Sequence, residues 1–291
     1  MPAINILPGL RDLAPAYDGF ILDLWGVVHD GHKLYDGVVH CLEELQNHGK
    51  RVTMLSNAPR RAETVADAMT EMGLDRALYD HVLSSGELAY RALEARDEPW
   101  YAALGRRCLH MGPDRDKGLF DGLGVEIVAD PDEAQFIVNT GPWQDGETVG
   151  DYEQVLAACA RRNLAMVCAN PDLEVIRGGR RIICAGTLAA RYEELGGEVH
   201  YHGKPFAAAY RACLEQMGLD DPGRILAIGD SLVTDIKGAL DAGLDTVLVT
   251  SGILAEELGT DYAEHPDPER LQAACERAGH IPNAAIPAFI W

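Results

Sequence analysis

The 291-residue sequence is poor in basic residues and contains no long hydrophobic run. Lys and Arg together number 25 against 46 Asp and Glu, which gives a formal net charge of -21. Only five lysines occur, and none of them lies in a basic run. A general nucleic-acid-binding protein is therefore not expected, because neutralising phosphates requires clustered Lys and Arg. The acidic charge also disfavours binding to anionic membranes, but it allows a small anion to bind in a local pocket.

Signals for secretion, membrane insertion and disulfide bonding are also missing. No segment approaches the roughly 18 consecutive apolar residues that a membrane-spanning helix needs. The first residues lack a basic start followed by a long apolar core, so we expect no signal peptide. The seven cysteines are widely spaced and form no CxxC pair, which disfavours zinc and a disulfide framework. We therefore expect reduced, buried thiols in a cytoplasmic protein.

The chain alternates short apolar runs with segments of helical periodicity, a pattern typical of a parallel α/β fold. In the first part, strands are predicted over 20–25, 51–56 and 81–84, with helices over 38–47 and 61–72. In the last part, strands are predicted over 199–202, 224–229 and 246–250, with helices over 206–217 and 235–242. Between these parts, strands are predicted over 108–111, 136–139, 165–168 and 182–184, with helices over 150–161 and 187–195.

This order of elements predicts two α/β domains, one inserted into the other. We expect residues 1–87 and 199–291 to form a Rossmann-like core, a parallel sheet with helices on both faces. Residues 88–198 are expected to form a second α/β domain, inserted after the third strand of that core.

Polar residues follow two strands in the first part of the predicted core. Open parallel sheets bind ligands where their strands end, so these residues are candidates for a site. The first strand leads to Asp23, for which a helix cap or a turn is the simpler interpretation. The second ends at Ser56 and Asn57, which are also typical of a helix start because Pro59 follows them.

Two further signals lie in the last part of the chain. Asp230 and Asp235 are five residues apart around a glycine turn, an arrangement that suggests a cation site as well as a helix cap. Lys204 lies in a turn fixed by Gly203 and Pro205, just before a predicted helix, and the alternative is an ordinary surface lysine.

Taken together and in this order, these residues resemble the four motifs of the haloacid dehalogenase-like hydrolase superfamily. The motifs are Asp23-Leu24-Trp25-Gly26-Val27, Ser56-Asn57, Lys204-Pro205, and Gly229-Asp230 through Asp235. The segment between the second and third motifs looks like a type-two cap domain. Its Asn170-Pro171-Asp172 is similar to the cap loop of the class IIA branch, which includes phosphatases of small metabolites. The resemblance spans about residues 18 to 255.

The resemblance implies a role for each motif in phosphate-ester hydrolysis. Asp23 would be the nucleophile that forms an aspartyl-phosphate, with Ser56 binding the phosphoryl oxygens and Lys204 neutralising their charge. Mg²⁺ would be held by Asp23, the backbone carbonyl of Trp25 and Asp230.

The same resemblance implies the outer parts of the site. Asp235 would be a further magnesium ligand or would support the ligands from behind. Asn57, Asn170 and Asp172 would contact the substrate, a small phosphorylated metabolite. Relatives with this cap type dimerise, so a homodimer is the expected assembly.

Trp25 departs from the pattern of this family. Phosphatases of the family normally carry a second Asp two residues after the nucleophile, where it serves as general acid and base. An indole N–H cannot protonate an alkoxide or deprotonate water at neutral pH, so hydrolysis of alkyl phosphates should be slow. Hydrolysis should be slowed less for acyl phosphates and for esters that leave as phenolates, because these leaving groups need no proton. His29 and Asp30, on the loop after the first strand, are candidates for supplying the missing proton.

Two functions remain open at this point. The first is a Mg²⁺-dependent phosphatase, favoured by the set of Asp23, Ser56, Lys204 and the two later acids. The second is a non-catalytic phosphate-metabolite-binding or regulatory protein, which Trp25 favours. A dinucleotide-dependent oxidoreductase is disfavoured because no GxGxxG follows the first strand. A receiver-type signalling domain is disfavoured by the length and the inserted domain.

Overall fold

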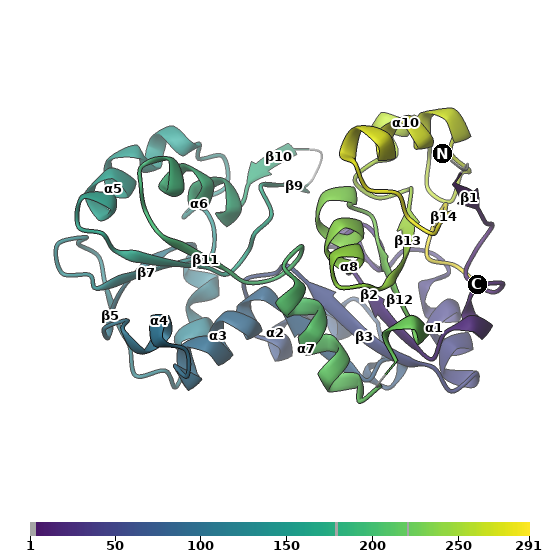
Figure 1. Cartoon of the computed structure of the whole chain (residues 1–291), viewed down its shortest axis with the longest axis horizontal. Coiled ribbons are helices and arrows are strands. Elements are labelled where there is room, and N and C mark those ends of the chain that lie inside the picture. The colour runs from purple at the N-terminus through teal and green to yellow at the C-terminus, as the bar shows by residue number, and fades with distance from the viewer. Residues whose placement is uncertain (1–3, 178–179, 220) are drawn as a thin grey trace. The chain divides into compact units, whose positions relative to one another are not determined.

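The computed structural model describes residues 4–177, 180–219 and 221–291 (Figure 1). The chain forms two compact units, each built from more than one segment. The first unit comprises Met1–Ser56, Ala66–Leu83 and Lys204–Trp291. The second comprises Asn57–Val65 and Ser84–Gly203.

The first unit is built on a seven-stranded sheet with the order β1-β14-β13-β12-β2-β3-β4. The pairs from β1 through β3 in this order are all parallel. The strands are β1 (Asn5–Ile6), β2 (Gly19–Leu22), β3 (Arg51–Ser56), β4 (His81–Ser84), β12 (Ile225–Gly229), β13 (Asp245–Val249) and β14 (Ala284–Ile286).

Both faces of this sheet are covered. Every residue of β2 and β12 is buried, and successive side chains of a strand point to opposite faces. The helices of the unit are α1 (Val38–Asn47), α7 (Ala207–Met217), α8 (Lys237–Asp241), α9 (Ala255–Leu258) and α10 (Pro268–Ala278), and α2 (Ala62–Glu71) spans the change of unit. Short turns of helix lie at η1 (Ala14–Ala16), η2 (Arg76–Leu78), η4 (Pro222–Arg224) and η5 (Leu232–Ile236), the last of which is a π-helix.

Local sequence explains which face of α1 is buried and how α10 begins. In α1 the residues Val38, Cys41, Leu42 and Leu45 are buried, which is the spacing of one helix face. At the start of α10 the side chain of Asp267 accepts hydrogen bonds from the N–H groups of Glu269 and Arg270, which have no carbonyl partner within the helix. The parallel strand pairs and the helices of this unit confirm the predicted parallel α/β core.

The strand order reverses direction at β2. From β2 the chain proceeds through β3 to β4 on one side, and the later β12, β13 and β14 follow on the other side. The carboxyl ends of β2 and β12 therefore flank the point at which parallel sheets of this kind bind ligands.

The second unit contains a five-stranded sheet with the order β11-β8-β7-β5-β6 and a separate antiparallel pair of β9 and β10. The strands are β5 (Arg107–Met111), β6 (Glu126–Val128), β7 (Phe136–Asn139), β8 (Ala165–Cys168), β9 (Glu174–Arg177), β10 (Arg180–Ile183) and β11 (Val199–Tyr201). The helices are α3 (Ser85–Ala95), α4 (Pro99–Ala102), α5 (Val149–Arg161) and α6 (Ala185–Glu194), with a 3-10 helix η3 (Asp114–Phe120).

Two details differ from the sequence prediction. The strand predicted over 199–202 was assigned to the core, but β11 pairs with β8 in the second sheet. The chain passes from β8 through α6 and returns to the edge of the same sheet. The strand predicted over 182–184 lies in the hairpin of β9 and β10 rather than in a parallel series. The boundaries 1–87, 88–198 and 199–291 thus need adjustment at β11, and the role of the inserted unit as a cap stays a prediction.

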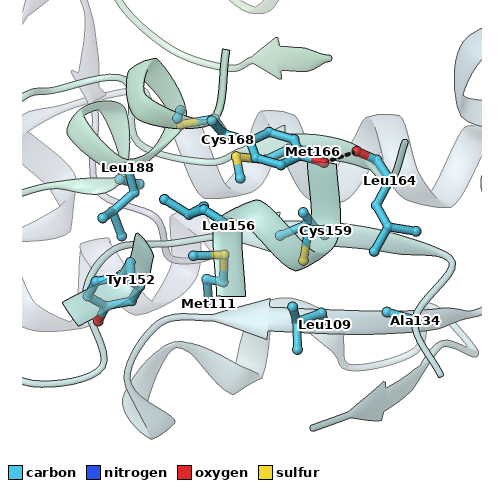
Figure 2. Packing of buried hydrophobic residues seen from close by; sticks show 14 of the residues in the cluster. Leu109, Met111, Ala134, Tyr152, Leu156, Cys159, Leu164, Met166, Cys168 and Leu188 are labelled. Atoms are coloured by element: carbon cyan, nitrogen blue, oxygen red, sulfur yellow. Dashed lines mark hydrogen bonds between the residues drawn. The ribbon is translucent and has the colours of Figure 1, made fainter. Parts of the chain in front are cut away.

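Apolar side chains cover both faces of the five-stranded sheet. Ile137 of β7 belongs to a cluster with residues of α5 and α6, whereas its neighbours Phe136 and Val138 belong to a cluster with α3 and α4. Figure 1 shows these two pairs of helices on opposite sides of the sheet. Figure 2 shows the first cluster. The hydroxyl of Tyr192, a member of this cluster, donates to the carbonyl of Leu164 at 2.6 Å.

All seven cysteines are free thiols and buried. Among the described residues no helix is both long and apolar enough to cross a membrane.

The cluster under α5 predicts the effect of a cavity in the second unit. Leu156 is fully buried among residues such as Met111 and Leu188 (Figure 2). We expect Leu156→Ala to lower the free energy of unfolding by about 2–5 kcal/mol, the cost of lost burial plus an unfilled cavity. Urea unfolding followed by circular dichroism measures this. A change below about 1 kcal/mol would show that the site can collapse around the missing side chain.

His110 predicts a pH dependence of stability. Burial lowers its pKa from 6.5 to about 4; Lys117 acts in the same direction and Asp114 opposes it. Its ring Nε2 lies 2.9 Å from the hydroxyl of Thr140. Between pH 6.5 and 4 the unfolded chain binds a proton here and the folded chain does not, so stability falls as the pH falls.

This contribution of His110 amounts to about 1.4 kcal/mol per pH unit. His110→Gln retains a polar partner for Thr140 and does not titrate, so its free energy of unfolding should decline less steeply with acid. Urea titrations of both proteins at pH 7 and pH 5 measure the difference. Parallel declines would contradict the prediction.

Candidate active site

Three buried carboxylates gather where the strand order of the first sheet reverses. Asp23 follows β2, and its backbone N–H donates to the carbonyl of Ile228 in β12 at 2.9 Å. Asp230 directly follows β12, and Asp235 lies in the π-helix η5. One oxygen of each carboxylate lies within 4.8 Å of the others. The strand-end pattern therefore brings together the residues from which a cation site was predicted.

Lys204 completes this carboxylate cluster, which we define as Asp23, Asp230, Asp235 and Lys204. Its ammonium donates to Asp23 and, at 2.7 Å, to Asp235. The residue is only 3% exposed. A surface lysine is thereby excluded, because this ammonium is buried between two carboxylates.

Burial dominates the protonation of these groups. It raises the pKa of Asp23 to about 7; Lys204 opposes this shift and Asp235 adds to it. Burial also raises the pKa of Asp230 well above its usual range, with Asp23 and Asp235 contributing in the same direction. For Lys204 burial acts to lower the pKa, but the two carboxylates that it contacts outweigh this and raise it. The lysine is therefore charged at neutral pH.

Two glycines and a backbone amide hold Asp230 in place. The N–H of Ile253, in the loop after β13, donates to its Oδ2 at 2.7 Å. A methyl group at Gly252 or at Gly26 would overlap this same carboxylate, and Gly26 also has a positive φ of 83°. Sequence reasoning missed Gly252 and Ile253. The available signal was a glycine three residues after the end of the buried strand β13.

Asp235 is held by its own turn and by α7. Its Oδ2 accepts from the N–H of Ser231 at 3.2 Å. The hydroxyl of Tyr210, from α7, donates to the backbone carbonyl of Asp235 at 2.9 Å. Tyr210 is a second residue that the sequence did not single out. It lies six residues after Lys204 on the helix that this lysine precedes.

Ser56 lies at the same edge of the sheet as Asp23. It is the last residue of β3, which pairs with β2 so that Met54 faces Leu22. The side chain of Ser56 is buried. The carboxyl ends of the three adjacent strands β3, β2 and β12 thus supply Ser56, Asp23 and Asp230.

The indole of Trp25 packs against its own loop. Its ring meets the ring of His29 edge-on, with centroids 5.8 Å apart. Gly31 has no room for a side chain because the indole fills that space. The loop is closed by the N–H of Gly26, which donates to the carbonyl of His29 at 3.0 Å.

Both of the expected replacement acids have lowered pKa values. Burial lowers the pKa of His29 to about 4, and its Nδ1 accepts from the N–H of Gly31 at 3.1 Å. The carboxylate of Asp30 accepts from the N–H groups of His32 and Lys33, both at 2.9 Å, which lower its pKa. Lowered pKa values disfavour both groups as acids at neutral pH, and the hypothesis that one of them protonates a leaving group stays a prediction.

The residues expected to contact substrate lie together in the second unit. The amide of Asn57 donates to Asp172 at 2.7 Å and accepts from the hydroxyl of Ser85 at 3.1 Å. Asn170 accepts from the N–H of Asp172 at 3.0 Å. These contacts fix Asn57 and Asp172 relative to each other. Ser85 is a further residue that sequence reasoning missed.

The cluster suits both a cation and an anion. Its three carboxylates and one ammonium carry a formal charge of -2 when all are ionised, which a divalent cation would balance. Hard divalent cations prefer oxygen ligands of this kind. The ammonium and a cation together would attract an anionic group to a protein that is acidic as a whole.

Comparison with known proteins identifies the family. Residues 20–126 match a model of haloacid dehalogenase-like hydrolases, and residues 201–272 match a HAD-hydrolase-like model. A crystal structure of a haloacid dehalogenase-like hydrolase from Brucella suis 1330 shares 33% identity, with full coverage of both chains and a TM-score of 0.80. The chain belongs to the haloacid dehalogenase-like hydrolase family. The predicted resemblance and hydrolase class are confirmed.

Two further relatives are similar in sequence to most of this haloacid dehalogenase-like hydrolase. Chronophin from Bos taurus is 28% identical over 275 residues, covering 87% of this chain and 88% of its own. D-glycerol 3-phosphate phosphatase from Mycobacterium tuberculosis is 28% identical over 250 residues, covering 84% and 66%.

A solved glycerol phosphate phosphatase from Mycobacterium tuberculosis, in complex with magnesium, shares the fold. It has a TM-score of 0.64 and 23% identity, over 93% of this chain and 79% of its own.

The buried ion pairs of this hydrolase predict a large effect of removing the ammonium. Lys204→Met would leave Asp23 and Asp235 buried without their cationic partner. We expect the free energy of unfolding at pH 7.5, measured with urea in the absence of divalent metal, to fall by about 3–5 kcal/mol. The decrease in the free energy of unfolding should be smaller at pH 5.5, because a protonated carboxyl group carries no charge for the ammonium to balance.

Lys237→Met is the matched control for this variant. Lys237 is exposed and pairs with Asp241 on α8 at 2.6 Å. Exposed ion pairs contribute little to stability, so this change should leave unfolding nearly unaltered. Equal effects of the two substitutions would contradict the structural role of Lys204.

Proposed function

We propose that this hydrolase is a magnesium-dependent phosphatase that acts on a small phosphorylated metabolite, with Asp23 as the nucleophile. The observation that carries the proposal is the carboxylate cluster, in which a buried lysine and three buried carboxylates meet at the strand switch point. Relatives named as phosphatases support the reaction class.

The residues present suit Mg²⁺. Three carboxylates lie within reach of one ion and leave a charge of -2 for it to balance. Asp23, Asp230 and the backbone carbonyl of Trp25 would hold the ion, with Asp235 as a further ligand or behind the others. When bound, Mg²⁺ supplies positive charge that neutralises the phosphoryl oxygens and favours the ionised form of Asp23.

The chain's own residues would carry the bond-making steps. A carboxylate oxygen of Asp23 attacks phosphorus, and the bond from phosphorus to the ester oxygen breaks with its electron pair leaving on that oxygen. Ser56 would hold the phosphoryl oxygens by hydrogen bonding, and Lys204 would orient Asp23 and balance its charge. Water then attacks the aspartyl-phosphate, which releases phosphate as a monoanion and restores the carboxylate of Asp23.

Trp25 would set the rate of the first step. General acid–base assistance is worth about 10²–10⁴-fold, and an indole cannot provide it. Esters whose leaving group needs a proton, such as alkyl phosphates, would therefore react slowly. Acyl and aryl phosphates would lose less.

A second candidate function rests on the same residue. If Trp25 has abolished turnover, the cluster would bind a phosphorylated metabolite without hydrolysing it. The protein would then be a binding or regulatory member of the family.

The remaining expectations belong to this proposal. Asn57, Asn170 and Asp172 would contact the substrate, and the inserted unit would act as a cap. A homodimer and a cytoplasmic location also stay predictions. The seven free thiols support the latter, because disulfides are rare in that compartment.

Phosphate release tests the proposal directly. We expect p-nitrophenyl phosphate and acetyl phosphate to be hydrolysed with Mg²⁺ and not after its removal by EDTA. Asp23→Asn should abolish turnover, because its amide is not a nucleophile of comparable strength. Trp25→Asp should raise kcat/KM on glycerol 3-phosphate toward the gain of about 10²–10⁴-fold that a general acid provides.

Asp241→Asn is the control for removing a carboxylate, because Asp241 lies on the surface of the same unit and pairs with Lys237. It should keep full activity. If neither the natural protein nor Trp25→Asp releases phosphate from any of these substrates, the result would contradict the phosphatase proposal and favour the binding function.

A further inference from the structure

Tyr210 is a buried residue outside the sequence motifs that links two segments of the carboxylate cluster. It lies on α7, six residues after Lys204, and is 1% exposed. Its hydroxyl oxygen lies 2.9 Å from the backbone carbonyl oxygen of Asp235 and 3.4 Å from that of Thr234. A carbonyl has no proton to give, so the phenol is the donor. The helix that follows Lys204 is therefore hydrogen-bonded to the π-helix that carries Asp235.

The π-helix η5 places Asp235 with few contacts of its own. Helices of this kind are rare, occur mostly as single turns and are frequent at functional sites. The carbonyl of Ser231 accepts from the N–H groups of both Asp235 and Ile236, each at 3.0 Å. The carboxylate of Asp235 accepts from the N–H of Ser231 at 3.2 Å, which is the long end of the range for such a bond. Support from α7 therefore matters for the position of Asp235.

Close packing accompanies the hydrogen bond between α7 and the segment that carries Asp235. Gly238 lies on α8, directly after η5. A methyl group at Gly238 would lie 2.6 Å from the ring of Tyr210 and 2.8 Å from the backbone of Pro205, the residue that follows Lys204. Close-packed interiors transmit displacements rather than absorbing them. A shift of Tyr210 would thus be felt in the segments that carry Lys204 and Asp235.

The ion pair of Lys204 and Asp235 connects this contact with the rest of the cluster. The ammonium donates to Asp235 at 2.7 Å and also to Asp23. Asp23, Lys204, Tyr210 and Asp235 line one small cavity. If Asp235 moved away, the ammonium would be drawn toward Asp23 and would compete with a cation for its oxygens. If Asp235 is itself a ligand, the cation would lose it, so both effects weaken cation binding.

We propose that Tyr210 is a positioning residue for the cation. Its hydroxyl holds η5 against α7 and thereby keeps Asp235 on the ammonium of Lys204, which leaves the oxygens of Asp23 accessible to a divalent ion. This inference rests on the proposed function, in which that ion is Mg²⁺. Tyr210 acts through Asp235 and has no contact with the substrate.

Tyr210→Phe removes the hydroxyl and keeps the ring against Gly238. We expect the dissociation constant for Mg²⁺, measured by isothermal titration calorimetry without substrate, to rise about 3–10-fold, the effect of one hydrogen bond. The Mg²⁺ concentration that half-saturates hydrolysis of acetyl phosphate should rise by the same factor. KM for acetyl phosphate at saturating Mg²⁺ should stay within about twofold, because uniform substrate binding is not altered.

Tyr192→Phe is the matched control for this variant. Tyr192 is also buried, and its hydroxyl donates to the carbonyl of Leu164 at 2.6 Å, within the second unit. The substitution removes the same atom and the same kind of bond, so it should lower the free energy of unfolding to a similar extent. It should leave the dissociation constant for Mg²⁺ unchanged. Only a positioning role predicts this difference between the two variants.

Gly238→Ala tests the same contact from α8 and keeps the hydroxyl of Tyr210. Its methyl group would push the ring of Tyr210 away, so the dissociation constant for Mg²⁺ should again rise. Alanine is a better helix former than glycine, so α8 itself is not weakened. This variant decides the question if Tyr210→Phe does not fold.

The outcomes separate the inference from the function on which it rests. If the natural protein does not bind Mg²⁺, the magnesium-dependent function is rejected and the inference with it. If the natural protein binds Mg²⁺ and the dissociation constant is unchanged in Tyr210→Phe, the inference is overturned and the function stands. An equal rise in Tyr192→Phe would also overturn the inference, because the effect would then follow stability rather than position.

Discussion

The ammonium of Lys204 between Asp23 and Asp235 is the interaction on which the site depends. Charges are costly to bury, and each of these groups is tolerable only because the others are present. The three residues come from the end of a strand, the start of a helix segment and a π-turn, which lie far apart in the sequence. Satisfying one lysine therefore fixes three loops relative to one another at the carboxyl edge of the first sheet.

The sheet supplies the second constraint. Because the strands are parallel, their carboxyl ends lie at one edge, and the reversal of order at β2 leaves room between neighbouring connections. Asp23 and Asp230 occupy that point from adjacent strands, with Ser56 on the other side of β2. Three buried carboxyl groups are thus concentrated at one place. This local imbalance, rather than the net charge of -21, is what suits the site to a divalent cation.

The sequence predicted the parts of the molecule that follow from local pattern. Buried apolar runs marked the strands of the first sheet, polar residues beyond their ends marked Asp23, Asp230 and Asp235, and a Gly/Pro turn before a helix marked Lys204. Packing decided the rest. Whether β11 joins the first or the second sheet depends on the strand with which it pairs. The hydrophobic periodicity of the sequence carries no information on that pairing. The hydrogen bond from Ile253 to Asp230 comes from a backbone group that every residue but proline possesses, so its residue type carries no signal. The position of the indole against Gly31 likewise depends on the course of the loop.

Asp230 lies between the Cα atoms of Gly26 and Gly252 and accepts a hydrogen bond from the next residue, Ile253. A carboxylate enclosed in this way has few rotamers available, so little conformational entropy remains to be lost when a ligand binds it. The same enclosure prevents the group from turning away when its charge is unbalanced. The two glycines, which contribute no chemistry of their own, thereby determine where this carboxylate is held.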